Sequence, residues 1–79
     1  MSEASDRAEL HDVIRAIGAA APQMRIGQIL AAIGELCDDM HGRGLWEAED
    51  RELLEAAWGF LRDLEAKSRS AIAEELPTS

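Results

Sequence analysis

Hydrophobic residues recur every three or four positions along most of this chain, which is the period of an α-helix with one buried face. The first such run consists of Leu10, Val13, Ile14 and Ile17. Asp6 precedes Glu9 by three residues, the spacing of a capping box, and Pro22 disfavours helical geometry at the residue before it. We therefore expect a first helix over about residues 6–20.

A second run lies between Pro22 and Gly42. Its apolar positions fall within an arc of about 120° when residues are placed at 100° intervals. These positions are Ile26, Ile29, Leu30, Ile33, Leu36, Cys37 and Met40. Because glycine is the usual residue just past a helix end, Gly42 marks the stop. The pattern predicts a second helix over about residues 24–41.

The third and longest run follows an acidic segment, whose charges suit the positive end of a helix. Its apolar positions are Leu53, Leu54, Ala57, Trp58, Phe60, Leu61 and Leu64, and the same phase continues through Ala71, Ile72 and Leu76. Pro77 ends it. We expect a third helix over about residues 47–75, about 43 Å long, against about 22 Å for each of the others.

These runs predict an all-α fold, with one domain over residues 1–79 and flexible ends at 1–5 and 77–79. Helices 24–41 and 47–75 should form an antiparallel hairpin, with helix 6–20 packed across it. The C-terminal third of the long helix extends past its neighbours and keeps its apolar phase. We therefore expect a homodimer formed through that segment.

Charge narrows the range of partners. The chain carries 16 acidic residues against 8 lysines and arginines, a formal net charge of -8. No basic stripe is present to neutralise phosphates, so we expect no direct nucleic-acid binding. No apolar run approaches the roughly 20 residues of a membrane span, and an acidic protein is repelled by anionic membranes. With no export signal at the N-terminus, we expect a cytoplasmic protein that binds neutral or basic protein surfaces.

Candidate chemistry is sparse. Cys37 is the only cysteine, which excludes an intrachain disulfide. Cys37 and His41 stand four residues apart, but two ligands are too few for a structural zinc site. His11 is expected at the surface of the first helix. No catalytic set or phosphate-binding loop can be assembled, so we predict no catalytic, cofactor or metal site and no enzymatic activity.

Small residues form a narrow stripe on the second predicted helix. Gly27, Ala31 and Gly34 lie beside its apolar arc. Each glycine costs a helix interior about 1 kcal/mol relative to alanine, so the stripe indicates a close approach by another element. Trp58 or Phe60 is a natural insert. The alternative is that these glycines are tolerated on a partly exposed face.

Large apolar side chains are the other interaction candidates. Trp46 and Trp58 are two of only three aromatic residues, and large rings dominate both cores and interfaces. A core position is the default for both, and Trp46 is the better candidate for an exposed anchor. Ile72 and Leu76 are candidates at the overhanging end of the third helix.

Acidic residues concentrate around the turn between the second and third helices. Residues 35–55 hold eight acidic residues and two arginines. Glu49 and Asp50 suit a helix start, whereas Asp38 and Asp39 lie at a helix C-terminus, where the dipole disfavours anions. A basic partner or a divalent cation would explain them. The alternative is that they are solvated acids that contribute only to solubility.

Two short segments carry a resemblance to a group of proteins. They are Arg25-Ile26-Gly27-Gln28-Ile29-Leu30, after Pro22, and Glu49-Asp50-Arg51-Glu52-Leu53-Leu54. The pattern resembles short uncharacterised bacterial and phage-associated helical proteins with an R-x-G-Q-x-L segment followed by E-D-x-E-L-L. The chain departs from it at Ala32, where asparagine is expected, and in an aromatic lead-in reduced to Trp46. The resemblance covers about residues 22–56 and implies only a compact helical unit.

Arg25 and Gln28 form the polar part of that pattern. Arg25 stands near the start of the second helix, where the dipole opposes a positive charge, so we expect it to have a specific acidic partner. Asp63 or Glu65 fits that role within one chain, and Asp50 fits it only across a dimer.

The sequence therefore predicts a non-catalytic interaction module, such as a small adaptor, assembly subunit or regulator. It would act through helix packing and an acidic turn. One alternative is an acidic inhibitor or antitoxin that occupies a basic site on its target. A second alternative is a small enzyme with a titrating pocket around His11 or Cys37.

Overall fold

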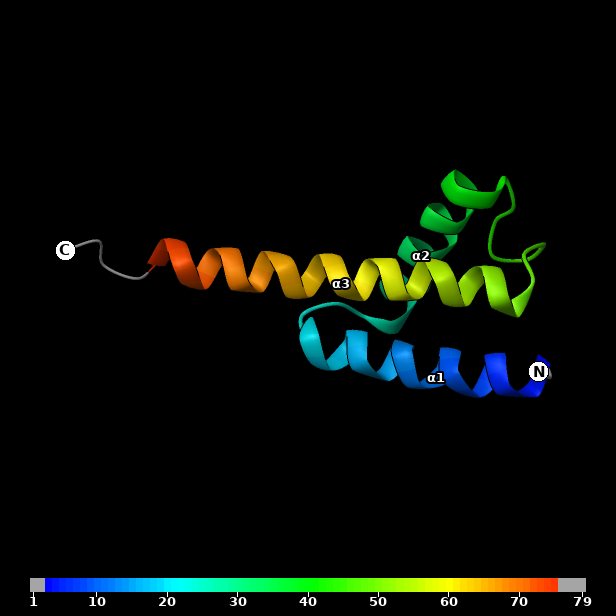
Figure 1. Ribbon diagram of the computed structural model, residues 1–79, viewed down its shortest axis with the longest axis horizontal. Helices are drawn as coiled ribbons and strands as arrows, with labels where there is room; N and C mark the ends of the chain where they lie inside the picture. The colour runs from blue at the N-terminus through cyan, green and yellow to red at the C-terminus, as the bar shows by residue number, and fades with distance from the viewer. Residues whose placement is uncertain (1–2, 76–79) are drawn as a thin grey trace.

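Three α-helices account for most of the described chain, which confirms the all-α prediction (Figure 1). They are α1 (Glu3–Ala20), α2 (Ile26–His41) and α3 (Asp50–Glu75). The computed structural model describes residues 3–75, and side chains over 5–68. Residues 3–5 belong to α1 rather than to a flexible end, and the expectation for residues 77–79 lies outside the described residues.

The helix ends at Ala20, His41 and Glu75 match the sequence prediction, whereas the helix starts do not. α1 begins three residues early, so Asp6 lies inside the helix and does not cap it. α2 begins two residues late because Arg25 has an extended backbone, with φ -81° and ψ 156°.

α3 begins at Asp50, three residues after the start that the sequence predicts. Residues 45–48 form turns instead, in which the carbonyl of Gly44 accepts hydrogen bonds from the N–H groups of Glu47, at 3.2 Å, and Ala48, at 2.9 Å. Because Gly44 satisfies these donors, the chain makes a compact connection before the helix begins.

α3 is the central element and packs against both other helices. α1 and α3 run side by side in the same direction (Figure 1), and Arg7 Nε donates a hydrogen bond to Asp50 Oδ2, at 2.9 Å, near their N-terminal ends. α2 crosses α3 at a steep angle (Figure 1), and His41 at its end lies beside Glu55 near the start of α3. Consecutive helices α2 and α3 therefore pack on each other as predicted, while α1 lies alongside α3.

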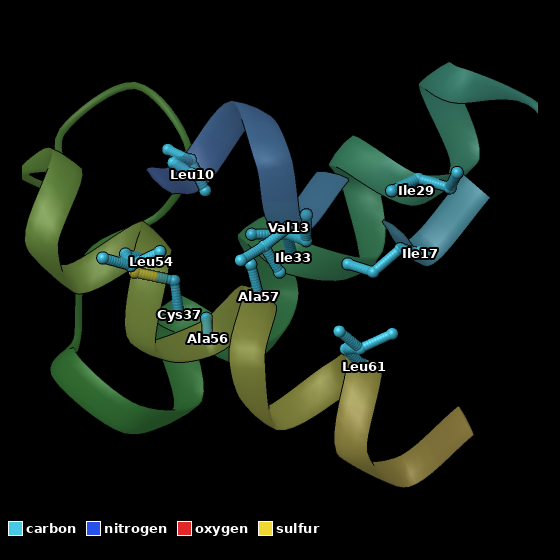
Figure 2. Packing of buried hydrophobic residues seen from close by; sticks show 10 residues of the cluster. All are labelled: Leu10, Val13, Ile17, Ile29, Ile33, Cys37, Leu54, Ala56, Ala57 and Leu61. Carbon is cyan, nitrogen blue, oxygen red and sulfur yellow. The ribbon is translucent and has the colours of Figure 1, made fainter. Parts of the chain in front are cut away.

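The core lies between the three helices, and Figure 2 shows its side chains converging from all of them. Its buried members are Leu10, Val13, Ile17, Ile29, Ile33, Cys37, Leu54, Ala56, Ala57 and Leu61. Ile17 and Ile33 are almost fully buried, and burying a side chain of this size stabilises a fold by about 1.5–3 kcal/mol. α3 contributes the short side chains of Ala56 and Ala57, which allow its neighbours to approach closely.

α3 is much longer than the helices it packs against. Its 26 residues extend about 39 Å, whereas the 18 residues of α1 extend about 27 Å. The C-terminal part of α3 therefore projects past both α1 and α2 (Figure 1). Among the described residues, none of these helices is both long and apolar enough to cross a membrane.

Candidate protein-interaction surface

The connection between α2 and α3 is shaped by a glycine and a turn. Gly42 ends α2 in the left-handed conformation, with φ 71° and ψ 17°, and its N–H donates to the carbonyl of Asp38 at 2.8 Å. A residue with a Cβ rarely adopts this conformation, so glycine fits the position. We call residues 42–49 the α2–α3 loop.

The α2–α3 loop is held against the helices on both sides of Trp46. Leu45 lies against buried Gly34, where a Cβ added to the glycine would stand 3.2 Å from the Cβ of Leu45. Ala48 packs on the edge of the core. Trp46, between them, points outward and has 94% of its surface exposed. The default expectation of a core position is therefore wrong for Trp46, which occupies the exposed position considered for it.

Four acidic residues near Trp46 in the sequence remain exposed. Asp38 and Asp39 lie near the end of α2, and Glu47 and Glu49 lie in the α2–α3 loop. Within the described residues, none of these four side chains forms an ion pair. Asp50 differs, because it is half-buried and pairs with Arg7 at 2.9 Å. Of these five carboxylates, Asp50 therefore has a structural role and the other four face solvent.

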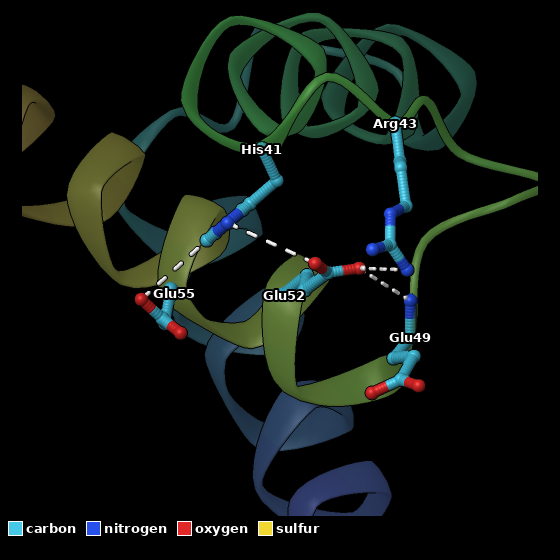
Figure 3. Close-up of polar contacts among 5 residues, drawn as sticks. All are labelled: His41, Arg43, Glu49, Glu52 and Glu55. Atoms are coloured by element: carbon cyan, nitrogen blue, oxygen red, sulfur yellow. Dashed lines mark hydrogen bonds and ion pairs between the residues drawn. The ribbon is translucent and has the colours of Figure 1, made fainter.

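A cluster of polar side chains links residues at the two ends of the α2–α3 loop (Figure 3). Glu52 Oε1 accepts a hydrogen bond from the N–H of Glu49 at 3.0 Å and lies 3.7 Å from Arg43 Nη1. The imidazole of His41 lies between Glu52, at 3.8 Å from Nδ1, and Glu55, at 3.9 Å from Nε2. His41 Nε2 is buried and has no hydrogen-bond partner within the described chain.

The small-residue stripe of α2 divides in two. Gly27 and Ala31 are exposed, and a Cβ at Gly27 would meet no atom within 4 Å. Gly34 alone is closely approached, and the approaching residue is Leu45, not Trp58 or Phe60. A loop rather than a helix crossing therefore explains Gly34, while the tolerated-glycine alternative fits Gly27.

Trp58 on α3 forms a hydrogen bond to α1. It is 39% exposed, and its Nε1 donates a hydrogen bond to Glu9 Oε2 at 2.7 Å. An indole N–H at the edge of an apolar contact usually finds such a partner. Trp58 thus has a structural role within one chain and is less available than Trp46 as an anchor.

The polar motif at the start of α2 serves the helix end. Gln28 Oε1 accepts a hydrogen bond from the N–H of Arg25 at 2.7 Å, which satisfies a donor at the helix N-terminus. The Arg25 side chain makes no capping hydrogen bond, and no ion pair with Asp63, Glu65 or another described residue is present. Gln28 therefore has a local structural role, whereas the side chain of Arg25 lies exposed.

The remaining candidates fall at the C-terminus. Ile72 belongs to the projecting part of α3, but its side chain lies outside the described ones. Leu76 lies outside the described residues altogether. The structure therefore describes the backbone of α3 up to Glu75, but not the apolar face that the sequence predicts for its end.

Candidate reactive groups are buried or isolated. Desolvation by burial raises the pKa of the Cys37 thiol, and the neighbouring carboxylates of Glu52, Asp38 and Glu55 raise it further, while Arg43 acts in the opposite sense. A thiol of this kind stays protonated and is a poor nucleophile. Across the described side chains, no cluster of three or more histidines, cysteines and carboxylates is arranged to hold a metal ion.

Sequence reasoning missed Leu45 and the carboxylates of Glu52 and Glu55. Glu52 follows Glu49 by three residues, which is the spacing of a capping pair and is visible in the sequence. Leu45 carries no such signal, because its contact with Gly34 depends on the path of the loop.

Comparisons of this chain with protein-family models, curated proteins and solved structures found no match.

Proposed function

We propose that this chain is a non-catalytic, cytoplasmic interaction protein that binds another protein through Trp46 and the α2–α3 loop. The observation that carries the proposal is the position of Trp46, which is 94% exposed on a loop held by Leu45 and Ala48. Tryptophan is enriched among the residues that dominate binding energy at interfaces. A side chain presented by a loop already in place also loses less conformational freedom on binding.

The charges around the loop favour one kind of partner surface. Asp38, Asp39, Glu47 and Glu49 are exposed and unpaired among the described residues, so they are free to attract lysines and arginines. The partner we propose has an apolar pocket for the indole and basic residues around it. Charge of this kind mainly speeds association, while the indole supplies affinity.

Site-specific photo-crosslinking in the host cell tests this proposal. A photoreactive amino acid is placed at Glu47, beside Trp46, and as a control at Ala19, which is exposed on α1. We expect a discrete adduct from position 47, its loss in the Trp46→Ala variant, and no such adduct from position 19. Because Trp46 is exposed, Trp46→Ala should change stability by no more than about 0.5 kcal/mol. An adduct that persists in Trp46→Ala would contradict the proposal.

A second candidate function is inhibition of a target whose basic site the acidic end occupies. The four unpaired carboxylates support it. With the photoreactive amino acid at position 47, which already removes that charge, neutralising Asp38, Asp39 and Glu49 together separates the two candidates. Under the inhibitor hypothesis this change abolishes the adduct while Trp46→Ala only weakens it. If Trp46 is the anchor, the order of the two effects is reversed.

A further inference from the structure

A shallow groove runs between α2 and α3, away from the α2–α3 loop. α2 supplies Ala32 and Leu36 and α3 supplies Phe60 and Leu64 to its apolar floor, each pair separated by one helical turn. All four side chains are partly exposed. α1 contributes no residue to this groove. Each of the two helices thus offers apolar residues spaced by one turn, which is the spacing found along the apolar ridge of an amphipathic helix.

The rim of the groove is acidic. Glu35 and Asp39 on α2 and Asp63 on α3 face a single base, Lys67. All four are exposed, and the described chain offers none of them an ion-pair partner. An apolar floor with unpaired carboxylates on its rim is complementary to an apolar ridge flanked by lysines or arginines.

We propose that this groove binds a basic amphipathic helix of another protein, packed against both α2 and α3. A groove-to-groove contact with a second copy of this chain is disfavoured, because two acidic rims would then face each other. The groove shares no residue with the α2–α3 loop, although Asp39 on its rim is also one of the four exposed carboxylates near Trp46. The proposal therefore goes beyond the binding proposed for Trp46 and does not depend on it.

The test is a titration of nitrogen-15-labelled full-length protein, followed by NMR. The probe is a synthetic helical peptide with leucine at every third or fourth position and lysine elsewhere. We expect saturable shifts of the amides in residues 32–39 and 60–67. A peptide with the same composition in alternating order, which cannot form an apolar ridge, should not produce them.

Two pairs of variants separate groove binding from general attraction to an acidic protein. Ala32→Phe fills the groove, whereas Ala31→Phe adds the same ring at the neighbouring exposed position. Ala32→Phe should weaken peptide binding by at least about tenfold, since about 1.4 kcal/mol of lost contact suffices for that change. Ala31→Phe should bind like the parent chain.

The second pair consists of two double variants. One carries Asp39→Asn and Asp63→Asn on the rim of the groove, and the other carries Glu47→Gln and Glu49→Gln in the α2–α3 loop. Both remove two charges. The rim variant should weaken binding about threefold to tenfold, as expected for two exposed ion pairs, and the loop variant by less than about twofold at physiological salt.

The groove proposal is overturned if both charge variants weaken peptide binding equally, or if the chemical-shift changes centre on residues 45–50. So would a dimer of the free protein that Ala32→Phe converts to a monomer, because the second copy would then be the occupant. Trp46→Ala should leave peptide binding unchanged, so failure of one proposal does not entail failure of the other.

Discussion

Gly34 fixes the path of the α2–α3 loop, because it leaves room for Leu45 against α2. A Cβ at position 34 would stand 3.2 Å from the Leu45 Cβ, which is closer than most Cβ contacts in proteins, so Leu45 must move by a few tenths of an ångström to admit it. The loop in turn places Trp46 in solvent. A single small residue therefore links the packing of α2 to the proposed binding surface.

Gly34→Val should destabilise the protein by about 1–3 kcal/mol, the usual cost of overpacking a filled site. The matched control is Gly59→Val in α3, where an added Cβ meets nothing within 4 Å. That change should be close to neutral, since valine and glycine differ by only a few tenths of a kcal/mol in helix propensity, roughly. Thermal unfolding of both variants checks this, and equal midpoints would contradict the role given to Leu45.

Cys37 should make stability fall at alkaline pH. Its folded pKa is raised by burial and nearby carboxylates, so the native state holds the proton more tightly than the unfolded chain does. The stabilisation is fully present below the unfolded thiol pKa of about 8.5 and is lost as pH rises through the higher folded value. The chain has no tyrosine and a single lysine, so few other groups titrate there.

Denaturant unfolding between neutral pH and about pH 10 measures this effect. The parent chain should lose stability over the alkaline part of that range, and Cys37→Ala should show a smaller loss from a lower starting value. If the free energy of unfolding falls with pH at the same rate in both proteins, the thiol does not contribute to the pH dependence.

At the scale of elements, the connection between α2 and α3 depends on Glu52. This carboxylate accepts the Glu49 N–H at the start of α3 and lies near Arg43 and His41 from the other end of the loop. It therefore satisfies a helix donor and links two segments at once. Glu55 also faces His41, at 3.9 Å, but caps nothing.

Glu52→Ala should destabilise the chain by about 1 kcal/mol, the typical cost of a lost helix cap. Glu52→Gln keeps an acceptor oxygen and should recover most of that loss, which separates capping from charge. Glu55→Ala should cost less than about 0.5 kcal/mol, as usual for an exposed pair. Chemical denaturation compares the three variants, and equal losses at both positions would contradict the capping role.

The periodicity of the sequence was sufficient to predict the helices but not how they begin. Helix ends carry local signals in Gly42 and Pro22, and these predicted the stops. The start of α3 carries only the Glu49–Glu52 spacing, which does not stand out because acidic residues occupy both the loop and the first turn. The sequence allowed an exposed Trp46 as an alternative but could not decide it, since the exposure depends on where Leu45 and Ala48 pack.

At the scale of the whole molecule, the main feature is a long central helix that two shorter helices cover only in part. The projecting segment, residues 66–75, holds two basic and two acidic residues, so charge does not oppose its pairing with a second copy. This favours the homodimer as a proposal for the end of α3, separate from the acidic groove. The apolar pattern of Ala71 and Ile72 supports it from sequence alone.

Light scattering over a range of concentrations tests the dimer. We expect the full chain to form a dimer and a chain ending at Glu65 to be a monomer with the same helical core, because the core residues end at Leu61. Circular dichroism of the shortened chain is the control for folding. If the full chain and the shortened chain are both monomers, the homodimer proposal is wrong. The projecting segment then either binds a different protein or has no binding role.

The central claim is that the chain presents Trp46 to a partner on a loop that is already held in place. Nitrogen-15 relaxation of residues 42–49 tests it directly. The claim predicts backbone order parameters of about 0.85, as in a rigid backbone, together with a solvent-exposed Trp46 indole. Order parameters below about 0.6 would contradict it, because the loop would then be mobile and Trp46 would not be preorganised for binding.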